Sequence, residues 1–395
     1  MVTAFGVLAG AAVAEAAPAG AVPAGRRIAP GVTYRQFDVD AAAGTAHAHL
    51  LTVDLANPHV RVDLLHPGAV AARATVSRMA DSAGAVAGVN GDFFNITESQ
   101  HPGVEATGAS VGPAVADGTV LKAAVPKGQR FGPALPPGTS TQDVLGVGTD
   151  RRAHLDRLSL SGSVDTPEGR LAMEGLNQYA LPENSVGAFT HLWGSTSRER
   201  AVCGTDTERA APCSTDTYEV TVTDGRVVSA ADAPGSGPIA ADSTVLVGRE
   251  EGARQLRKLS VGDAVSVSHT LVAASGTPYA FAIGGFPVLR DGAPLTGLDD
   301  TTTAVRTVVG FKDGGQQLLL LVLDGAAAYR TGMTVAEEAD TMRSLGATDA
   351  FNLDGGGSSE LVTRDADASA VTVRNHPSGG AERAVANGIG VFSLP

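Results

Sequence analysis

The chain has 395 residues, of which 43% are hydrophobic and 18% charged, a balance typical of folded globular proteins. This length allows one large domain or two ordinary ones. The net charge of −13 excludes a surface that wraps nucleic acid or anionic lipid, because such surfaces need a basic stripe.

The first 24 residues have the composition of an export leader. Met1 begins an apolar run followed by small residues of the kind that signal peptidases accept, although the usual basic segment is missing. The run is well short of the roughly 20 residues that a membrane span needs. We therefore expect a leader over 1–24, a secreted or extracellular protein, and no stable membrane insertion.

Residues 25–70 form a predicted N-terminal β region. Apolar and polar residues alternate over 34–40, 47–55 and 60–65, as they do in half-buried strands. A short helix is predicted over 75–83, because Thr75 is a favourable N-cap and Gly84 a favourable stop. A buried strand over 85–89 then leads into Asn90-Gly91-Asp92.

The middle section, 153–269, is predicted to be rich in strands. It includes a hairpin whose strands, 218–222 and 227–230, flank a turn at 223–226. Cys203 and Cys213 are the two cysteines of the chain. In an exported protein such a pair most simply forms one disulfide that pins a loop, whereas two free thiols fit a cytosolic protein.

The last third carries the clearest local signals. The apolar run 317–323 predicts a strand covered on both faces, and it stops at Asp324-Gly325. A helix follows over 334–345, where Thr334 and Glu337 match a capping box and Gly346 matches a C-terminal cap. A short strand over 350–353 ends at Asp354.

No segment has the composition of a flexible tether. We therefore expect one large mixed domain of the α+β class, with β-rich sheets, a few short helices, and a site on the loops at strand ends. The order helix, strand, Asn-x-Asp occurs twice, ending at Asn90–Asp92 and at Asn352–Asp354. Chance explains this echo, because caps and strand ends favour these residues; the alternative places both tips at one rim of a sheet.

Four polar tips follow predicted strands, at 90–92, 284–285, 324–325 and 352–359. Carboxylates at strand ends can serve as nucleophile, base or acid, and glycines let a ligand approach the backbone closely. Each tip alone could be an ordinary turn; together they indicate a hydrolytic or sugar-handling site. Oxygen ligands at the tips leave a structural calcium ion possible, although the full spacing of an EF-hand loop is missing.

Six segments, in this order, resemble the phosphodiester glycosidase family: 88–94, 282–286, 306–310, 323–325, 332–339 and 351–359. The last reads Phe-Asn-Leu-Asp-Gly-Gly-Gly-Ser-Ser and is the most specific. Arg383 to Asn387 and the strand after them are similar to the C-terminal end of the family. The resemblance covers 71–395, which is the expected catalytic domain.

The resemblance implies an exported glycosidase that cleaves a sugar-1-phosphodiester, for example an α-N-acetylglucosamine-1-phosphodiester, to a free sugar and a phosphomonoester. A phosphomonoester leaves without a strong general acid, so the site needs a carboxylate near the anomeric carbon and cations or amides around the phosphate. No cofactor is required by this chemistry.

The resemblance also implies the site residues, of which Arg306 is assigned to the phosphate. The catalytic candidates are the carboxylates Asp92, Asp324, Glu337 and Asp354. The substrate-binding candidates are Asn90, Gly284, Gly285, Arg306, Thr334, Asn352, Gly355, Gly356, Ser358, Ser359 and Arg383. The alternative role of Arg383 is to brace its loop.

The main alternative function is a non-catalytic binder of phosphorylated cell-surface glycan. Intact motif residues at every tip favour the enzyme, because a decayed site usually shows replacements. A calcium-stabilised surface protein is compatible with either function.

Overall fold

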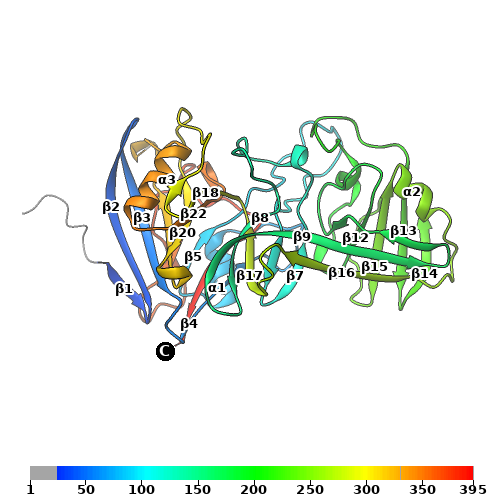
Figure 1. The fold of residues 1–395 in the computed structure, drawn as a ribbon, viewed down its shortest axis with the longest axis horizontal. Helices are drawn as coiled ribbons and strands as arrows, with labels where there is room; N and C mark the ends of the chain where they lie inside the picture. The colour runs from blue at the N-terminus through cyan, green and yellow to red at the C-terminus, as the bar shows by residue number, and fades with distance from the viewer. Residues whose placement is uncertain (1–24, 330, 395) are drawn as a thin grey trace, which may run out of the picture.

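The computed structural model describes residues 25–329 and 331–394, so the predicted leader lies outside the described residues (Figure 1). Strands dominate, and the α-helices are short: α1 (Val76–Ala83), α2 (Glu251–Leu256) and α3 (Val335–Ser344). The predicted α+β class with β-rich sheets is confirmed. Within the described ranges, no helix is long and apolar enough to cross a membrane.

An eight-stranded antiparallel sheet forms one side of the molecule. In spatial order its strands are β1 (Arg26–Ala29), β2 (Val32–Ala41), β3 (Gly44–Asp54), β21 (Gln317–Leu323), β20 (Thr307–Lys312), β22 (Asp349–Asn352), β18 (Phe286–Arg290) and β19 (Ala293–Pro294). The N-terminal strands therefore form one edge of the sheet that also contains the strands from the last third of the chain. All but the first residue of β21 are buried, which confirms a strand covered on both faces.

A five-stranded sheet packs against this one. Its order is β24 (Val371–Val373), β23 (Leu361–Arg364), β5 (Ala87–Asn90), β25 (Gly388–Ser393) and β4 (Val60–Leu65). One core cluster joins the two sheets, with Leu51 and Val322 from the first and Val89 and Ile389 from the second. Burial of these side chains fixes β5 against the eight-stranded sheet.

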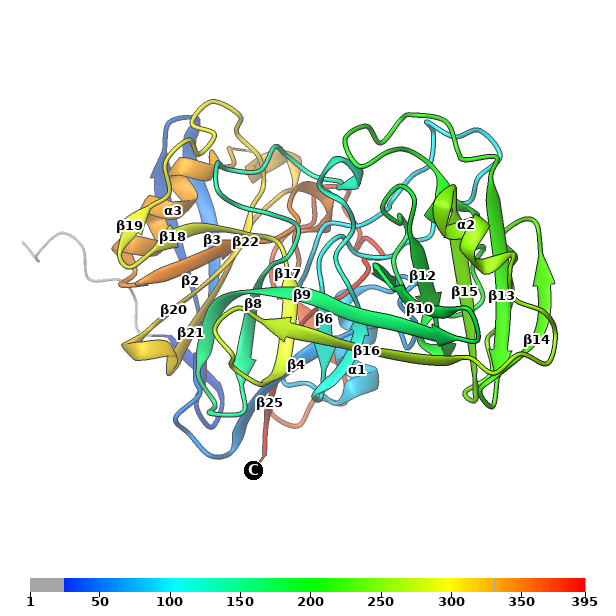
Figure 2. The same cartoon turned by 45° about the vertical axis from the view of Figure 1, so that its right-hand side comes forward.

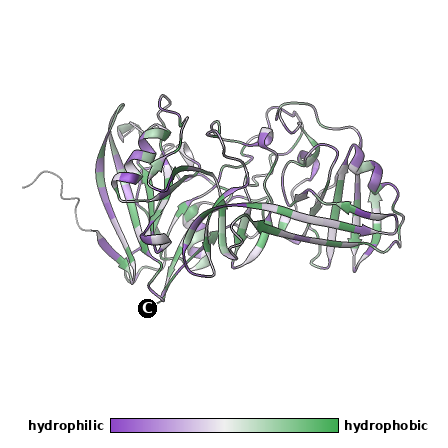
Figure 3. Cartoon of the chain, in the orientation of Figure 1, coloured by the Kyte–Doolittle hydropathy of each residue, from purple (hydrophilic) through white to green (hydrophobic). Residues whose placement is uncertain are grey.

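A second lobe lies beyond these sheets (Figure 2). The connecting sheet contains β10 (Gly169–Ala172), β9 (Ala153–Thr166), β8 (Asp143–Gly148), β17 (Tyr279–Gly284), β6 (Ala114–Ala116) and β7 (Thr119–Lys122), with β16 (Ser266–Ala273) paired to β9. The lobe itself contains β11 (Gly175–Leu176), β12 (Val186–Phe189), β15 (Ser243–Arg249), β13 (Thr217–Thr223) and β14 (Arg226–Ala231). Figure 3 shows hydrophobic strands in both halves of the molecule.

Local signals produced the elements that they predicted. The hairpin of β13 and β14 is confirmed, and its turn residues Asp224 and Gly225 have φ of 48° and 72°, as a tight hairpin requires. Thr75 caps α1, which ends at Gly84 in the left-handed region. Thr334 and Glu337 form the predicted capping box of α3.

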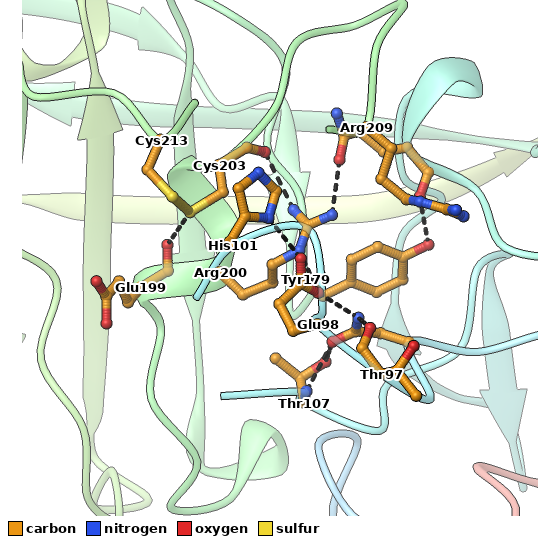
Figure 4. Close-up of polar contacts among 12 residues, drawn as sticks. Thr97, Glu98, His101, Thr107, Tyr179, Glu199, Arg200, Cys203, Arg209 and Cys213 are labelled. Carbon is orange, nitrogen blue, oxygen red and sulfur yellow. Dashed lines mark hydrogen bonds and ion pairs between the residues drawn. A yellow bond between two sulfur atoms is a disulfide. The ribbon is translucent and has the colours of Figure 1, made fainter. Parts of the chain in front are cut away.

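The predicted disulfide between Cys203 and Cys213 is present, and a buried polar network lies beside it (Figure 4). Glu98 Oε2 pairs with Arg200 Nε at 2.7 Å, and Glu98 Oε1 contacts His101 Nδ1 at 2.5 Å. His101 Nε2 contacts the carbonyl oxygen of Ala211 at 2.8 Å, inside the disulfide loop. The network thus ties that loop to the segment after Asp92.

Candidate active site

The two Asn-x-Asp tips meet at the junction of the two packed sheets. Asp354 N–H donates to Gly91 O at 2.9 Å, and Asn90 Nδ2 donates to Asp354 O at 2.6 Å. β5 belongs to the five-stranded sheet and β22 to the eight-stranded one. The echoed tips are therefore adjacent, but on two sheets rather than at the rim of one.

The glycine pair at the end of β17, Gly284 and Gly285, lies between these tips. A Cβ on Gly284 would stand 2.5 Å from Asp92 Oδ2, and one on Gly285 would collide with the carbonyl oxygen of Asn352. Gly285 also has a φ of 154°, which L side chains rarely adopt. The predicted tip at 284–285 therefore belongs to the same site, because its backbone contacts Asp92 and Asn352 so closely that only glycine fits there.

Asp92 is a buried carboxylate with one hydrogen-bonded oxygen and one oxygen that lacks a hydrogen-bond partner among the described residues. Oδ2 accepts a hydrogen bond from Gly112 N at 2.6 Å, and the backbone N–H of Asp92 donates to Asn387 Oδ1 at 2.9 Å. Oδ1 has no hydrogen-bond partner among the described residues. Burial raises the pKa of Asp92, and the Gly112 N–H, Lys122 and Arg130 partly offset that rise.

Lys122, which the sequence analysis missed, is fully buried beside Asp92. Its Nζ donates to the carbonyl oxygens of Gly112 at 2.5 Å, Ala123 at 2.6 Å and Val111 at 3.3 Å. Burial lowers its pKa, and the charge of Asp92 opposes that shift. A lysine inside the apolar stretch 120–125 was the available signal, because lysine is almost never fully buried without a partner.

Asp354 is the second carboxylate of the junction. Its Oδ1 accepts from Gly355 N at 2.9 Å. Burial raises the pKa of Asp354 to about 6, against hydrogen bonds from Ser358 and Gly355 and the charge of Arg383, while the charge of Asp92 raises it further. The two carboxyl groups therefore lie close enough to influence each other.

Two arginines flank the carboxylate pair. Arg383 is exposed, packs over Gly357, and donates from Nη1 to Ser358 Oγ at 3.3 Å. Arg130 lies over the rings of Phe93 and Phe286, at 5.3 and 5.9 Å from their centroids, and its charge acts on Asp92. Sequence reasoning gave no role to Arg130, which lies in a turn-rich segment far from any motif.

Some of the predicted asparagine and serine ligands have hydrogen-bond partners for their side chains, and one does not. Asn90 Oδ1 accepts from Thr307 Oγ1 at 2.8 Å and from Glu360 N at 3.1 Å, and Ser359 Oγ lies 3.1 Å from the same threonine hydroxyl. Asn352 is buried, yet neither Oδ1 nor Nδ2 has a partner in the described part of the chain. Such a group costs about 1–3 kcal/mol unless a ligand or water satisfies it.

Arg306 and Glu337, by contrast, are held by backbone groups. Arg306 donates from Nε to Met333 O and from Nη2 to Thr302 O, both at 2.8 Å. Glu337 accepts from Thr334 N at 2.8 Å and from Ala42 N at 2.5 Å, and Thr334 caps α3. Their functional roles stay predictions.

The buried carboxyl group of α3 is Glu338, not Glu337. Glu338 Oε2 lies 4.0 Å from Arg306 Nε, and burial raises the pKa of Glu338 to about 8. The capping-box pattern had directed attention to its neighbour.

Asp324 ends β21 on the far side of β20 from Asn352, where two histidines surround it. Its Oδ1 lies 3.0 Å from His49 Nε2 and 3.1 Å from His376 Nδ1, and accepts from the backbone N–H of His376 at 2.6 Å. Burial raises the pKa of Asp324, but hydrogen bonds from both histidines outweigh burial, so the net shift is downward.

One group of described residues has ligand atoms spaced for a metal, namely His101, Cys203 and Cys213, within 4.8 Å of one another. The two sulfurs form the disulfide, and both His101 nitrogens contact oxygen atoms. This cluster is therefore not a metal site in its oxidised form. The structural calcium ion considered from the sequence stays a prediction.

Comparison with known proteins agrees with the resemblance read from the motifs. Residues 216–392 match the model of the phosphodiester glycosidase family. This match is shorter than the resemblance over 71–395 and does not include Asp92. No curated protein sequence matches the chain.

Two solved structures share the fold, and a third is less similar. A hypothetical protein from Synechocystis has a TM-score of 0.70 at 20% identity over 92% of this chain, which spans 62% of that protein. A putative exported protein from Burkholderia pseudomallei has a TM-score of 0.64 at 23% identity, over 89% of this chain and 74% of that one. The zebrafish N-acetylglucosamine-1-phosphodiester alpha-N-acetylglucosaminidase catalytic domain, auto-inhibited by its pro-peptide, has a TM-score of 0.45 at 14% identity, over 92% and 83%.

Proposed function

We propose, from the premise that residues 216–392 match the phosphodiester glycosidase family, that this protein hydrolyses a sugar-1-phosphodiester at the anomeric carbon. The products are a free sugar and a phosphomonoester, and N-acetylglucosamine is the sugar to test first. The observation that carries the proposal is the junction itself. There the backbone N–H of Asp354 donates to Gly91 O, next to Asp92, and the charge of Asp92 raises the pKa of Asp354. Asp92 Oδ1 and the Asn352 amide lack hydrogen-bond partners among the described residues.

The proposed phosphate position is the turn 355–358. Arg383 is exposed beside Ser358, and backbone N–H groups in a glycine-rich turn favour anionic oxygens. A guanidinium binds two phosphate oxygens through parallel hydrogen bonds. Arg383 is therefore a stronger candidate for the phosphate than Arg306, two of whose nitrogens donate to carbonyls.

In the proposed reaction, the bond between the anomeric carbon and the phosphate oxygen breaks, and the phosphomonoester leaves with the electron pair. Water supplies the new hydroxyl group of the sugar. Arg383 and the turn amides stabilise the charge on the leaving phosphate. Asp92 and Asp354 are the proposed nucleophile or base, and raised pKa values suit groups that exchange protons near neutral pH.

Asp324 and Glu337 remain lesser candidates for the carboxylate role. Asp324 contacts two imidazoles, and both carboxylate oxygens of Glu337 accept backbone N–H groups. Neither has an unpartnered buried oxygen comparable to Asp92 Oδ1.

The test is release of N-acetylglucosamine from UDP-N-acetylglucosamine and from simple α-sugar-1-phosphodiesters. We expect the wild type to release sugar, and Asp354→Asn and Arg383→Ala to lose at least about 100-fold in rate, the scale of one catalytic proton-transfer or charge-stabilising group. Glu337→Gln tests the lesser carboxylate candidate in the α3 cap and should retain most activity.

Full activity in both site variants would overturn the assignment. No release from any donor, together with tight binding of a phosphorylated glycan, would favour the non-catalytic binder instead.

We also infer that the protein is exported. The leader-like composition of 1–24, the disulfide, and the fold shared with a putative exported protein support this proposal.

A further inference from the structure

We propose that a pocket beside the candidate active site is a second subsite, which binds a neutral, hydroxyl-rich group such as a sugar ring. The pocket has a volume of about 340 Å³ and lies between the N-terminal hairpin and the loop that follows β24. Its lining includes Asp38, His47, His49, Asp324, Tyr329 and His376. None of these residues except Asp324 belongs to a family-like motif.

Aromatic and imidazole rings form one wall of the pocket. The rings of Tyr329 and His376 stack with centroids 4.7 Å apart and planes 25° apart. His47 meets Tyr329 edge-on at 5.0 Å. Ligand pockets combine such apolar ring faces with a few placed polar groups, and a sugar ring offers C–H faces to the former and hydroxyls to the latter.

The wall is held by a buried chain of hydrogen bonds. Tyr34 OH lies 2.8 Å from His49 Nδ1, and His49 Nε2 lies 3.0 Å from Asp324 Oδ1, which in turn contacts His376. The His49 side chain is 3% exposed, whereas that of His376 is 56% exposed. The buried members therefore fix His376 while its ring stays accessible, so that little ordering is needed on binding.

The carboxylates among the described lining residues are paired with imidazoles. Asp38 pairs with His47 at 2.5 Å, and Asp324 contacts His49 and His376. The described lining residues include no lysine or arginine. Paired carboxylates and imidazoles can accept hydrogen bonds from hydroxyl groups and donate hydrogen bonds to them, whereas two carboxylates do not favour a phosphate.

The pocket adjoins the proposed phosphate position. Ser378 Oγ donates to Gly356 O at 3.2 Å, and Gly325 N donates to His376 O at 2.8 Å, so one loop borders both places. β21 and β22 flank β20, which puts their ends two strand spacings, or about 10 Å, apart. The alcohol half of a phosphodiester held at Gly356 would point to this pocket; that part of the inference rests on the proposed function.

Binding is tested without any turnover, by saturation-transfer NMR and titration with methyl α-glucopyranoside and methyl N-acetyl-α-glucosaminide. We expect Tyr329→Ala and His376→Ala to weaken binding by about tenfold, the loss of one aromatic contact. Tyr329→Phe keeps the ring and should restore binding, and Tyr218→Ala, on β13, is the matched control elsewhere in the chain.

Equal binding by wild type and Tyr329→Ala would overturn the subsite, as would binding of inorganic phosphate in place of both glycosides. Thermal unfolding of each variant separates loss of binding from loss of fold. The subsite and the proposed function fail separately: glycoside binding without sugar release contradicts only the function.

If both hold, a phosphodiester whose alcohol is a sugar should show a KM about tenfold higher with Tyr329→Ala, whereas a methyl phosphodiester should not. An equal effect on both substrates would contradict the link between the two subsites.

Discussion

Asp354 and Asp324 lie just after β22 and β21 of the same sheet, yet their surroundings shift their pKa values in opposite directions. Burial raises the pKa of Asp354 to about 6, whereas two histidines lower that of Asp324. A raised carboxyl pKa means that stability falls as pH rises through the folded value, and a lowered one means that stability falls as pH drops through it. The two residues therefore have opposite effects on stability at neutral pH.

Asp354→Asn should lower the rate of sugar release at least about 100-fold and yet stabilise the fold at pH 8, by up to about 3 kcal/mol, because the folded pKa is raised from 3.8 to about 6. At pH 4 the gain should nearly vanish, because the carboxyl group is then protonated. Asp324→Asn is the matched control and should destabilise at pH 8. Urea unfolding at both pH values measures this, and a destabilised Asp354→Asn at pH 8 would contradict the assignment.

Burial raises the pKa of Asp92, and the charge of Lys122 is one of the effects that oppose this rise. Lys122→Met should raise the pKa of Asp92 and move the acid limb of the pH–rate profile to higher pH. It should also cost about 1–3 kcal/mol, since buried carbonyls at 111, 112 and 123 lose their donor. Lys258→Met, which removes an exposed lysine, should change neither quantity. An acid limb that stays in place would exclude this coupling.

Residues at strand ends were predictable from the sequence, and residues defined by burial were not. Asp92, Asn352 and Asp354 follow apolar runs and glycines, which is a local pattern. Lys122 and Arg130 reach the junction only because segments distant in sequence pack around them. Glu338 lies on the buried face of α3, whereas the local capping pattern drew attention to Glu337.

At the scale of elements, β23 and the loop before β25 are joined by a carboxyl pair. The pair consists of Glu360, just before β23, and Glu382, in the loop. Burial, a hydrogen bond with Glu382 and the charge of Glu382 raise the pKa of Glu360 to about 9. Ser77 Oγ donates to Glu382 at 2.6 Å, and Glu382 precedes Arg383. A protonated Glu360 thus helps to fix the loop that carries the proposed phosphate ligand.

The raised pKa of Glu360 predicts that stability falls as pH rises from about 4.5 to about 9, because the unfolded chain loses this proton before the folded protein does. Activity should fall as pH rises through about 9, because the folded pair then holds two charges. Glu360→Gln cannot ionise and should flatten the loss of stability between about pH 6 and 9, as followed by thermal unfolding. Glu337→Gln, which weakens the α3 cap, should lower stability by a similar amount throughout the range from about pH 6 to 9, where Glu337 stays ionised. A Glu360→Gln variant with the same pH dependence as wild type would exclude the carboxyl pair as the cause.

Elements with local signals were predicted well, and their partners were not. The apolar run of β21, the capping box of α3 and the turn of the β13–β14 hairpin each lie within a few residues. The pairing of β3 with β21 joins residues more than 260 apart in the numbering, from Asp54 to Gln317. Such pairing depends on the total burial of both sheets, which no local pattern encodes.

At the scale of the whole molecule, the second lobe reaches the candidate site through the disulfide loop. Arg209, inside that loop, donates to Arg130 O at 2.8 Å and lies over the ring of Phe131 at 4.1 Å. Arg130 in turn acts on Asp92. The loop between the cysteines, which carried no functional signal in the sequence, therefore braces a residue beside the proposed carboxylates.

Replacing both cysteines, Cys203→Ser with Cys213→Ser, should lower the free energy of unfolding by roughly 2–3 kcal/mol, the entropy that a cross-link of this length removes from the unfolded chain. It should also lower the rate of sugar release, because a loosened loop no longer fixes Arg130. Arg209→Ala keeps the disulfide and removes only the contact to Arg130, so it should lower the rate with a smaller loss of stability. If the double variant loses stability but keeps the full rate, the disulfide loop serves the second lobe alone and Arg130 is held by its own ring contacts with Phe93 and Phe286.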